Sequence, residues 1–376
     1  MTRTEELRLL LLVKGLGLGG VERIVVDLAR GLAAQGVAVT VANVNPDRGR
    51  LRSPIIESGV EVVDLDGSDL IGFKAAARLA RLVRSRRYDV VHVHGPLPAV
   101  LARLSTIGES SPCVVTTSHT PWSSLRAPTR LAWWLTARRD DASIAVSSAV
   151  AASLPRAAGA STHVIPHGVD PERIHAVRSR YPHADSDESA PLRAIVVAGH
   201  RDAKNYPNLL RSIRAAVDLG ADFHVLAFGD GASRDAHAAM AESLGIADRI
   251  RFLPRVDDVL SQIAQSDVLI VASDFEGQPM VAAEALALGV PVISTAVGRV
   301  PEMVTPAVGR VVATRDPRAL GSALAELARS PALRNELADA ARSRPLGWTV
   351  DDVVERHLEL YADLVDGVYR AGNRQR

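Results

Sequence analysis

Short runs of Val, Ile, Leu and Ala alternate along the chain with longer segments whose apolar residues recur at helical spacing. Apolar runs of about four to eight residues are typical of strands buried on both faces, and strands that alternate with helices form parallel sheets. Seven such runs lie in the first half of the chain, at 9–13, 37–44, 60–65, 90–94, 114–117, 143–146 and 163–165. Six more lie at 194–198, 223–228, 250–253, 268–271, 290–294 and 309–312. The pattern predicts an α/β protein built on parallel sheets.

The two series of strands are separated by a polar stretch without periodicity. The 376-residue chain is too long for one ordinary hydrophobic core, so two domains are expected. We place them at 1–172 and 193–348, joined by a linker at 173–192. Apolar residues at helical spacing from Val350 to Tyr361 predict a C-terminal helix, which with the tail occupies 349–376.

Composition narrows the class of protein. Apolar residues make up 47% of the chain and charged residues 23%, as in soluble globular proteins, and the net charge of +1 gives no reason to expect nucleic acid as a partner. The single cysteine, Cys113, excludes an internal disulfide. The apolar run at 7–13 is too short to span a membrane. We expect a cytoplasmic protein, with peripheral contact at the inner face of the membrane left open.

Two glutamates frame the most informative segment. Pro279 suits the first position of a helix, and Gly289 suits a left-handed helix stop. Glu276 then precedes the helix and Glu284 lies near its middle. A helix N-terminus attracts phosphate, so an anion bound there would have a carboxylate on each side to accept hydrogen bonds from hydroxyls. Diphosphate between two polyols describes a nucleotide sugar. The alternative is two solvated charges, but the apolar neighbours of Glu284 predict burial, which carboxylates seldom tolerate without a partner.

The order of several linked motifs in this region resembles that of a known family. The chain is similar to retaining glycosyltransferases of the GT-B fold, glycosyltransferase family 4, in Ser273-x-x-Glu276-Gly277-x-Pro279, Glu284-Ala285, Gly289-x-Pro291-Val292 and Gly298-x-x-x-Glu302. The resemblance covers nearly the whole chain. It implies two Rossmann-like domains facing across a cleft, with a C-terminal helix that crosses back to the first domain.

A glycine-rich turn follows the first expected strand. Gly15, Gly17 and Gly20 satisfy G-x-G-x-x-G, which raises a dinucleotide-binding dehydrogenase as an alternative. A dehydrogenase of this kind needs an acidic residue at the end of the second strand to bind the ribose, and this chain has asparagines there. In family 4 a glycine pair here lets the loop approach the donor phosphates, and Gly19 and Gly20 match it. A tight turn without a ligand is the other interpretation.

Cations follow the first strand of the second domain. Arg201 and Lys204 stand beside Gly199 at a strand's carboxyl end, where they could clamp a diphosphate leaving group. The family pattern is Gly-Arg followed by Lys-Asn. Here His200 stands directly after the glycine, so either His200 or Arg201 could take the arginine's place. A solvated charged loop is the alternative.

Histidines mark the ends of strands in the first domain. His119 matches the family histidine that faces the donor sugar, and His94 with Gly95 is a candidate for acceptor contacts. Simple packing is an equal alternative for His94. The segment from Ile165 to Asp170 matches the family's junction between domains, which we interpret as a structural hinge.

The resemblance also implies a role for each remaining donor-side residue. Glu276 would bind sugar hydroxyls and Glu284 the ribose, while Arg201 and Lys204 neutralise the diphosphate. Backbone next to the nucleobase would come from Pro254 and Arg255. The phosphate or sugar would meet the start of the helix, which comprises Gly277, Gln278, Pro279 (which has no amide hydrogen), Met280 and Val281.

No metal site or cofactor is implied. Asp64 and Asp66 resemble a metal-binding pair but fit a turn better, and no Cys/His metal spacing occurs. An arginine-rich helix at 78–87 and the tryptophans before Arg138 could hold an anionic membrane, although a solvated helix face is favoured.

These expectations combine into one function. The chain should transfer a sugar from a UDP- or GDP-linked donor to the hydroxyl of a glycan, lipid or small molecule, with retention of configuration. A nucleotide-sugar epimerase and a non-catalytic nucleotide-sugar-binding protein of the same fold are the alternatives.

Overall fold

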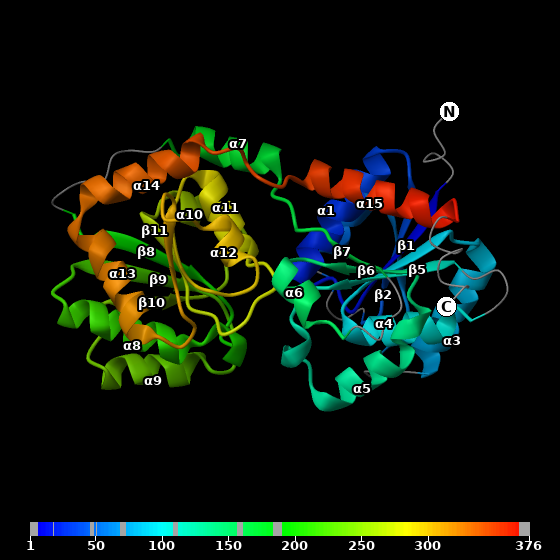
Figure 1. Cartoon of the computed structure of the whole chain (residues 1–376), viewed down its shortest axis with the longest axis horizontal. Helices are drawn as coiled ribbons and strands as arrows, with labels where there is room; N and C mark the ends of the chain where they lie inside the picture. Colours follow the sequence, from blue (N-terminus) through cyan, green and yellow to red (C-terminus); the bar gives the residue numbers. More distant parts are fainter. Residues whose placement is uncertain are drawn as a thin grey trace. The chain divides into compact units, whose positions relative to one another are not determined.

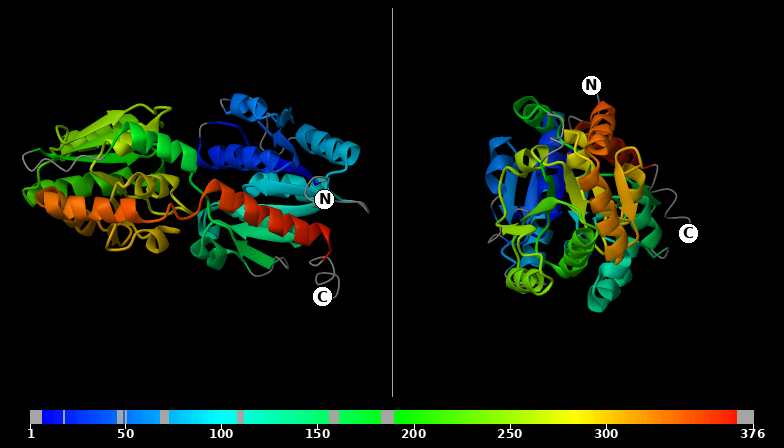
Figure 2. Two further views of the ribbon diagram at one scale, coloured as in Figure 1. Left: turned by 90° about the horizontal axis from the view of Figure 1, so that it is seen from above. Right: turned by 90° about the vertical axis from the view of Figure 1, so that its left-hand side faces the viewer.

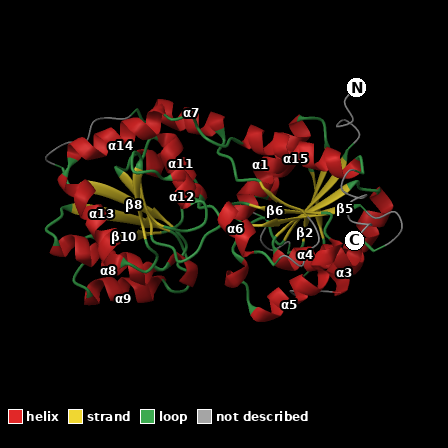
Figure 3. Ribbon diagram, in the orientation of Figure 1, coloured by secondary structure: helices red, strands yellow, loops and turns green. Residues whose placement is uncertain are grey.

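The computed structural model describes residues 7–17, 19–45, 49, 51–67, 73–107, 112–155, 161–182 and 190–367 (Figure 1). The chain forms two compact units. Unit 1 consists of Met1–Gly168 together with Trp348–Arg376, and unit 2 consists of Val169–Gly347. In each unit, helices cover both faces of a parallel sheet (Figure 3).

Unit 1 is built on a seven-stranded parallel sheet in the order β3-β2-β1-β4-β5-β6-β7. The strands are β1 (Arg8–Val13), β2 (Ala38–Asn43), β3 (Glu61–Asp64), β4 (Val90–His94), β5 (Cys113–Ser118), β6 (Ala142–Ala145) and β7 (Ser161–Val164). The α-helices are α1 (Gly20–Ala34), α2 (Arg52–Glu57), α3 (Phe73–Arg86), α4 (Pro96–Ser105), α5 (Ala127–Thr136), α6 (Ser148–Ser153) and α15 (Val350–Val365). The 3₁₀ turns η3 (Trp122–Ser124) and η4 (Ala137–Arg139) flank α5.

Alternation along β1 divides the core of unit 1 into two layers. Leu9 and Leu11 join a buried cluster with α1, α2 and α15. Leu10 and Leu12 point to the opposite face and join a cluster with α3, α4 and α5. The last helix of the chain therefore completes the core of the unit that the N-terminus begins (Figure 1).

Unit 2 repeats the plan with six parallel strands in the order β10-β9-β8-β11-β12-β13. These are β8 (Leu192–Val197), β9 (Phe223–Phe228), β10 (Ile250–Leu253), β11 (Val268–Val271), β12 (Val292–Thr295) and β13 (Gly309–Val312). The helices are α7 (Pro171–Arg180), η6 (Asp202–Lys204), α8 (Tyr206–Asp218), α9 (Arg234–Ser243), α10 (Val259–Ala264), α11 (Met280–Leu288), α12 (Val300–Met303), α13 (Pro317–Arg329) and α14 (Pro331–Ser343).

Helix ends follow the capping residues in the sequence. Gly289 ends α11 in the left-handed conformation, with φ of 80°, as its position predicts. Thr349 and Asp352 form a reciprocal capping box at the start of α15. Pro279 lies one position earlier than expected, at the N-cap of α11 rather than at its first helical residue.

The predicted fold class is confirmed, since each expected strand overlaps a strand of the structure and α15 packs onto unit 1. The expected linker is wrong in part. Asp170 caps a helix, α7, that begins with Pro171 and buries Ile174 among residues of unit 2. A capping Asp followed by Pro is a helix start, which outweighs the polar composition of the segment. Residues 183–189 of the linker, and the tail beyond 367, lie outside the described residues.

Candidate functional site

Both sheets have a point at which the strand order changes direction. In unit 2 the chain runs outward from β8 to β10 and then returns to build β11 to β13 on the other side. In unit 1 the same change falls between β1 and β4. Ligands of open parallel sheets bind beyond the carboxyl ends of strands at such a point. Gly19 and Gly20 follow β1, Lys204 follows β8 and Glu276 follows β11, so these predicted site residues lie beyond strands at the change of direction. Figure 2 shows the two units from two further sides, coloured along the chain.

Lys204 and Glu276 meet at the change of direction in unit 2. Lys204 comes after β8 and Glu276 after β11, and Lys204 Nζ donates to Glu276 Oε1 over 2.5 Å. Ser273 Oγ donates to the same oxygen over 2.8 Å. The two donors orient the carboxylate, and the three residues line a hollow together with Pro279 and Val281. The structure thus brings together the first carboxylate and the second cation that the sequence predicts.

Helix α11 begins at this hollow without a side-chain cap. Its N-cap residue, Pro279, has no side-chain acceptor, whereas Asn205, Asp316 and Ser330 cap α8, α13 and α14 in the same unit. First-turn amides have no partner inside a helix. The amides of Met280 and Val281 and the partial positive charge of the helix end therefore favour an anion beside Glu276.

The turn before α11 is held tightly. Gly298 has φ of +49°, and a Cβ there would lie 2.1 Å from the carbonyl oxygen of Gly277. The amide of Arg299 donates to that oxygen over 3.0 Å. Gly277 and Gln278 are buried, and Glu284 on α11 is half-buried. The turn that precedes α11 is thus held in place at Gly277 by the loop that contains Gly298 and Arg299.

Arg201 and His200 have different environments. His200 is 3% exposed, stacks on Tyr206 with ring centroids 4.1 Å apart and contacts His237 through Nδ1 at 2.8 Å. Burial lowers the pKa of His200 to about 4, so the ring is neutral at pH 7. Arg201 is exposed, and its Nε lies 3.7 Å from where a Cβ of Gly199 would be. Arg201 is therefore the cation that can meet an anion here.

The predicted nucleobase segment follows the outermost strand of the same sheet. Pro254 and Arg255 follow β10, the edge strand, and both are exposed. Arg234 Nη2 donates to the carbonyl of Phe252 over 2.9 Å and so fixes the end of that strand. Strand β9 separates this segment from β8 and the Lys204–Glu276 pair.

In unit 1, three histidines form a hydrogen-bonded row, which we call the histidine row (His94, His119 and His167). His94 Nδ1 lies 3.1 Å from His119 Nε2, and His119 Nδ1 lies 3.2 Å from His167 Nε2. Burial is the main cause that lowers the pKa of His119 to about 4. Because both ring nitrogens of His119 have a histidine partner, its tautomer depends on both neighbours.

A second pair of histidines continues the cluster into the core. His92 contacts Tyr361 Oη and Thr117 Oγ1, each at 2.6 Å, and His357 donates to the carbonyl of Val353. Burial lowers the pKa of His92 and of His94 well below 6.5 and that of His357 to about 4. Helix α15 is thus joined to β4 and β5 through polar groups that are neutral at pH 7.

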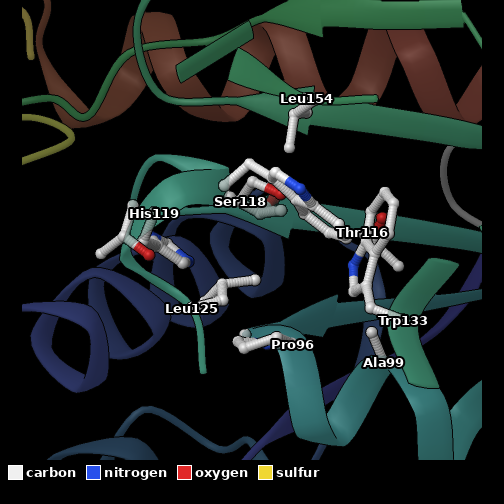
Figure 4. Close-up of a pocket in the computed structure, with 12 residues that line it drawn as sticks. Pro96, Ala99, Thr116, Ser118, His119, Leu125, Trp133 and Leu154 are labelled. Carbon is white, nitrogen blue, oxygen red and sulfur yellow. The ribbon is translucent and has the colours of Figure 1, made fainter. Parts of the chain in front are cut away.

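His94 does not reach the surface. It is 3% exposed and packs behind His119, which does not fit a direct contact with an acceptor. Gly95 has φ of +103° and lines a hollow with His119, Trp122, Leu125 and Trp133 (Figure 4). The structure therefore does not favour His94 for acceptor contacts, and the acceptor-side role of Gly95 stays a prediction.

The glycine pair is not required by the turn itself. Gly19 has φ of −78°, and a Cβ at Gly20 would meet no atom within 4 Å. A Cβ at Gly19 would meet only the flexible carboxylate of Glu22. No described residue of unit 1 requires glycine at either position, so the expected close approach of a ligand stays a prediction.

Sequence reasoning missed several residues of these two groups. His167 was placed in a hinge, and Ser273, Tyr361 and His357 had no predicted role. The partners of His167 and Tyr361, which are His119 and His92, lie 48 and 269 residues away, so no spacing rule could find these two. Ser273, by contrast, stands three residues before its partner Glu276, a spacing that the sequence does show. Among the described residues, no three His, Cys, Asp or Glu side chains are placed to hold a metal ion. No helix of the described chain is long and apolar enough to cross a membrane.

Two family models match successive parts of the chain. The model described as Glycosyltransferase Family 4 matches residues 18–173, and the model described as Glycosyl transferases group 1 matches residues 185–344. A D-inositol 3-phosphate glycosyltransferase from Xylanimonas cellulosilytica is 28% identical over 92% of this chain and 91% of that protein. An N-acetyl-alpha-D-glucosaminyl L-malate synthase from Bacillus anthracis is 23% identical over 77% of this chain and 78% of that protein.

Solved structures share the whole fold. Sucrose-phosphate synthase from Thermosynechococcus elongatus superposes with a TM-score of 0.80 at 20% identity, over 96% of this chain and 100% of that one. Anabaena HepE, solved with UDP and glucose, gives a TM-score of 0.78 at 17% identity, over 95% of this chain and 99% of that one.

Proposed function

The chain belongs to glycosyltransferase family 4 and has the GT-B fold, and from this we propose that it moves a sugar from a UDP- or GDP-linked donor to an acceptor hydroxyl with retention of configuration. The observation that carries the proposal is the Lys204–Glu276 pair at the uncapped start of α11. A cation, a carboxylate and free helix amides are together the groups needed to bind a diphosphate joined to a polyol.

Each charged group has a stated task in this proposal. Glu276, oriented by Ser273, accepts hydrogen bonds from sugar hydroxyls. Glu284 accepts from the ribose. Lys204, Arg201 and the first amides of α11 stabilise negative charge on the diphosphate, which grows as the bond to the sugar breaks. The cations come from side chains, so no metal or cofactor is part of the proposal.

The reaction balances without a further reactant. The bond between the anomeric carbon and the diphosphate oxygen breaks, and its electron pair stays on the diphosphate. The acceptor oxygen forms a bond to the same carbon from the same face. Its proton passes to the departing phosphate oxygen. The products are the glycoside and the nucleoside diphosphate. His119, neutral through its low pKa, contributes a ring that can donate or accept a hydrogen bond but carries no charge.

The names of two relatives support a hydroxyl acceptor. D-inositol 3-phosphate and L-malate, which appear in those names, each carry hydroxyl groups and negative charge. We therefore propose a small hydroxylated molecule, a glycan or a lipid headgroup as the acceptor class.

The test is a donor panel with two variants. UDP-, GDP- and ADP-sugars are incubated with the protein, and thermal midpoints and released nucleoside diphosphate are measured. We expect one nucleotide class to stabilise unit 2, and expect Glu276→Ala and Lys204→Ala to lower transfer by at least about a hundredfold, as loss of groups that stabilise transition-state charge does. The control is Arg211→Ala, which removes an exposed arginine in the middle of α8. Addition of EDTA should leave turnover unchanged.

Two outcomes would overturn the proposal. Stabilisation by NAD and by no nucleotide sugar would favour the dehydrogenase alternative. Conversion of a donor to its epimer in the absence of any acceptor would favour the epimerase.

A further inference from the structure

Helix α5 carries an apolar stripe on its outer side. Leu131, Trp134 and Leu135 recur at helical spacing and are 59%, 47% and 64% exposed. Trp133, on the inner side of the same helix, is 3% exposed and packs in the core. A surface helix usually has one apolar face toward the core and a polar face toward solvent. Helix α5 differs, because its outer side is apolar at these three positions.

The end of α4, which packs against α5, carries two further exposed apolar side chains. Leu104 and Ile107 are 52% and 62% exposed. The buried Arg103 beside them donates to the carbonyl of Trp133 and to Thr136 Oγ1, which holds the end of α4 against α5. We call the five exposed side chains the apolar patch (Leu104, Ile107, Leu131, Trp134 and Leu135). They are half of the ten large apolar side chains exposed in the described chain.

The helices around the patch are basic. Helices α3, α4 and α5 contain no Asp or Glu, and they carry one lysine and six arginines. Ser105 Oγ donates to the carbonyl of Ala76, which places the start of α3 beside the end of α4. The exposed cations on and beside these helices include Lys74, Arg81, Arg84, Arg126 and Arg138, none of which forms an ion pair with another described residue.

The opposite face of the same sheet has the opposite charge. Helix α15 carries five acidic residues, Asp351, Asp352, Glu355, Glu359 and Asp363, and one arginine. The whole chain has a net charge of only +1. Helix α15 lies on one face of the sheet of unit 1 and α3, α4 and α5 lie on the other (Figure 1). The apolar patch is therefore on the side that carries the basic helices.

We propose that the face formed by α3, α4 and α5 is a docking surface for a lipid bilayer that contains anionic lipids. Leu and Trp side chains at the patch would enter the boundary between headgroups and acyl chains, where Trp is favoured. The arginines around the patch would bind the anionic headgroups while their stems lie along apolar surface.

A bilayer fits this face better than a second copy of the chain. Helices α3, α4 and α5 offer no acidic side chain of their own to a second copy, and the acids that contact α3, Asp66 and Glu61, are already paired with Arg78 and Arg86. A symmetric contact would therefore bring mainly like charges together. A bilayer needs no shaped counterpart, and a flat helix with an apolar stripe and basic flanks is the form that binds at such an interface.

The docking surface adjoins the hollow beside His119. The same helix α5 supplies Trp133 to the wall of that hollow, and Trp122 packs edge-on against Trp133 with centroids 5.1 Å apart. Docking through α5 would therefore bring the acceptor-side hollow of the proposed enzyme close to lipid headgroups.

The test measures vesicle binding without any nucleotide sugar. The full-length protein is sedimented with phosphatidylcholine vesicles and with vesicles that also contain phosphatidylglycerol. We expect the protein to bind the vesicles that contain phosphatidylglycerol, and to bind phosphatidylcholine vesicles at least about tenfold more weakly. Added salt should lower binding to the anionic vesicles. Leu131→Ser/Leu135→Ser should lower binding about tenfold or more, because lost apolar burial weakens interfacial partitioning. Arg126→Gln/Arg138→Gln should lower it in the same direction.

Matched controls separate the patch from general effects. Ile56→Ser on α2 and Leu219→Ser after α8 remove apolar side chains that are 50% and 46% exposed elsewhere, and both should bind vesicles as the parent protein does. Trp134→Phe should abolish the blue shift of tryptophan fluorescence on binding if this side chain enters the bilayer. Circular dichroism confirms that each variant is folded.

Three results would overturn the proposal. They are no binding to anionic vesicles, equal binding by the patch variants and the controls, and a dimer in light scattering that the patch variants abolish. The proposed function is tested separately, because Lys204→Ala should lose transfer and keep vesicle binding.

Discussion

The buried histidines of unit 1 should make it sensitive to mild acid. His92, His94 and His357 are 0%, 3% and 4% exposed, and burial holds the pKa of each below 6.5, for His357 at about 4. The unfolded chain therefore binds protons below pH 6.5 that the folded chain does not. The stability that these three groups contribute is fully present above the unfolded pKa of about 6.5 and is lost as the pH drops from there toward the folded pKa.

The magnitude follows from the number of groups. Each histidine that must stay neutral costs about 1.4 kcal/mol for each pH unit below 6.5. Three of them at pH 5.5 cost about 4 kcal/mol, a large share of the roughly 5–15 kcal/mol that stabilises a typical domain. His119 is left out because it is only half-buried.

Tryptophan fluorescence reports this unit alone. All four tryptophans, Trp122, Trp133, Trp134 and Trp348, belong to unit 1. Urea unfolding followed by fluorescence at pH 7.5 and 5.5 should show the midpoint fall by about 2 M, taking an m-value of about 2 kcal/mol per M. His357→Gln should lower the pH dependence by about one third, whatever it does to stability at pH 7.5.

A midpoint that does not change between the two pH values would refute the reasoning. So would an unchanged pH dependence in His357→Gln, since it would assign the effect to other groups. A less buried histidine serves as a check: His163, on the edge strand β7, is half-buried, so His163→Gln should change the dependence less than His357→Gln does.

Two further substitutions test the packing around the proposed sites. Gly298→Ala forces a side chain onto φ of +49° and into the carbonyl of Gly277, so we expect a loss of about 1–3 kcal/mol and a larger loss of transfer than in Gly220→Ala, which has φ of +74° but open space. Urea unfolding and turnover measure both, and equal turnover in the two variants would contradict it. Arg103→Met leaves the buried Asp140 without its cation and should cost about 3–5 kcal/mol in urea unfolding, part of which Arg103→Met/Asp140→Asn should restore; no recovery in the double variant would contradict the pairing.

The architecture could be predicted from the sequence because both sheets are buried on two faces. Runs such as Leu9–Val13 and Val268–Val271 are apolar without interruption, so strand positions are visible without any contact information. Lys204 and Glu276 could each be predicted as a candidate site residue, because each follows a strand at the change of direction in unit 2, whereas the ion pair between them is seen only in the structure. Parallel strands place their carboxyl ends on one edge, and the order of the chain then decides which loops meet.

The histidine row and the apolar patch could not be predicted in the same way. His94, His119 and His167 come from the ends of three strands, and lone histidines at strand ends have no characteristic spacing. Trp133 and Trp134 are adjacent in sequence, yet one is buried and the other exposed. Only the packing of α5 against α4 decides which face of the helix is outside. The linker prediction was wrong in part for a local reason. Asp170 and Pro171 start a helix, and the polar composition of the segment does not reveal it.

The return of α15 to unit 1 has a consequence for the order of folding during synthesis. Unit 2 is continuous from Val169 to Gly347, so all of its strands have been made before α15 exists. Unit 1 is begun before unit 2 but lacks Tyr361 and Leu364, both completely buried, until α15 has been synthesised. Domains usually fold from the N-terminus onward as they are synthesised. Here the second unit can fold first, and the apolar surface that α15 covers stays open until the residues that follow unit 2 have been made.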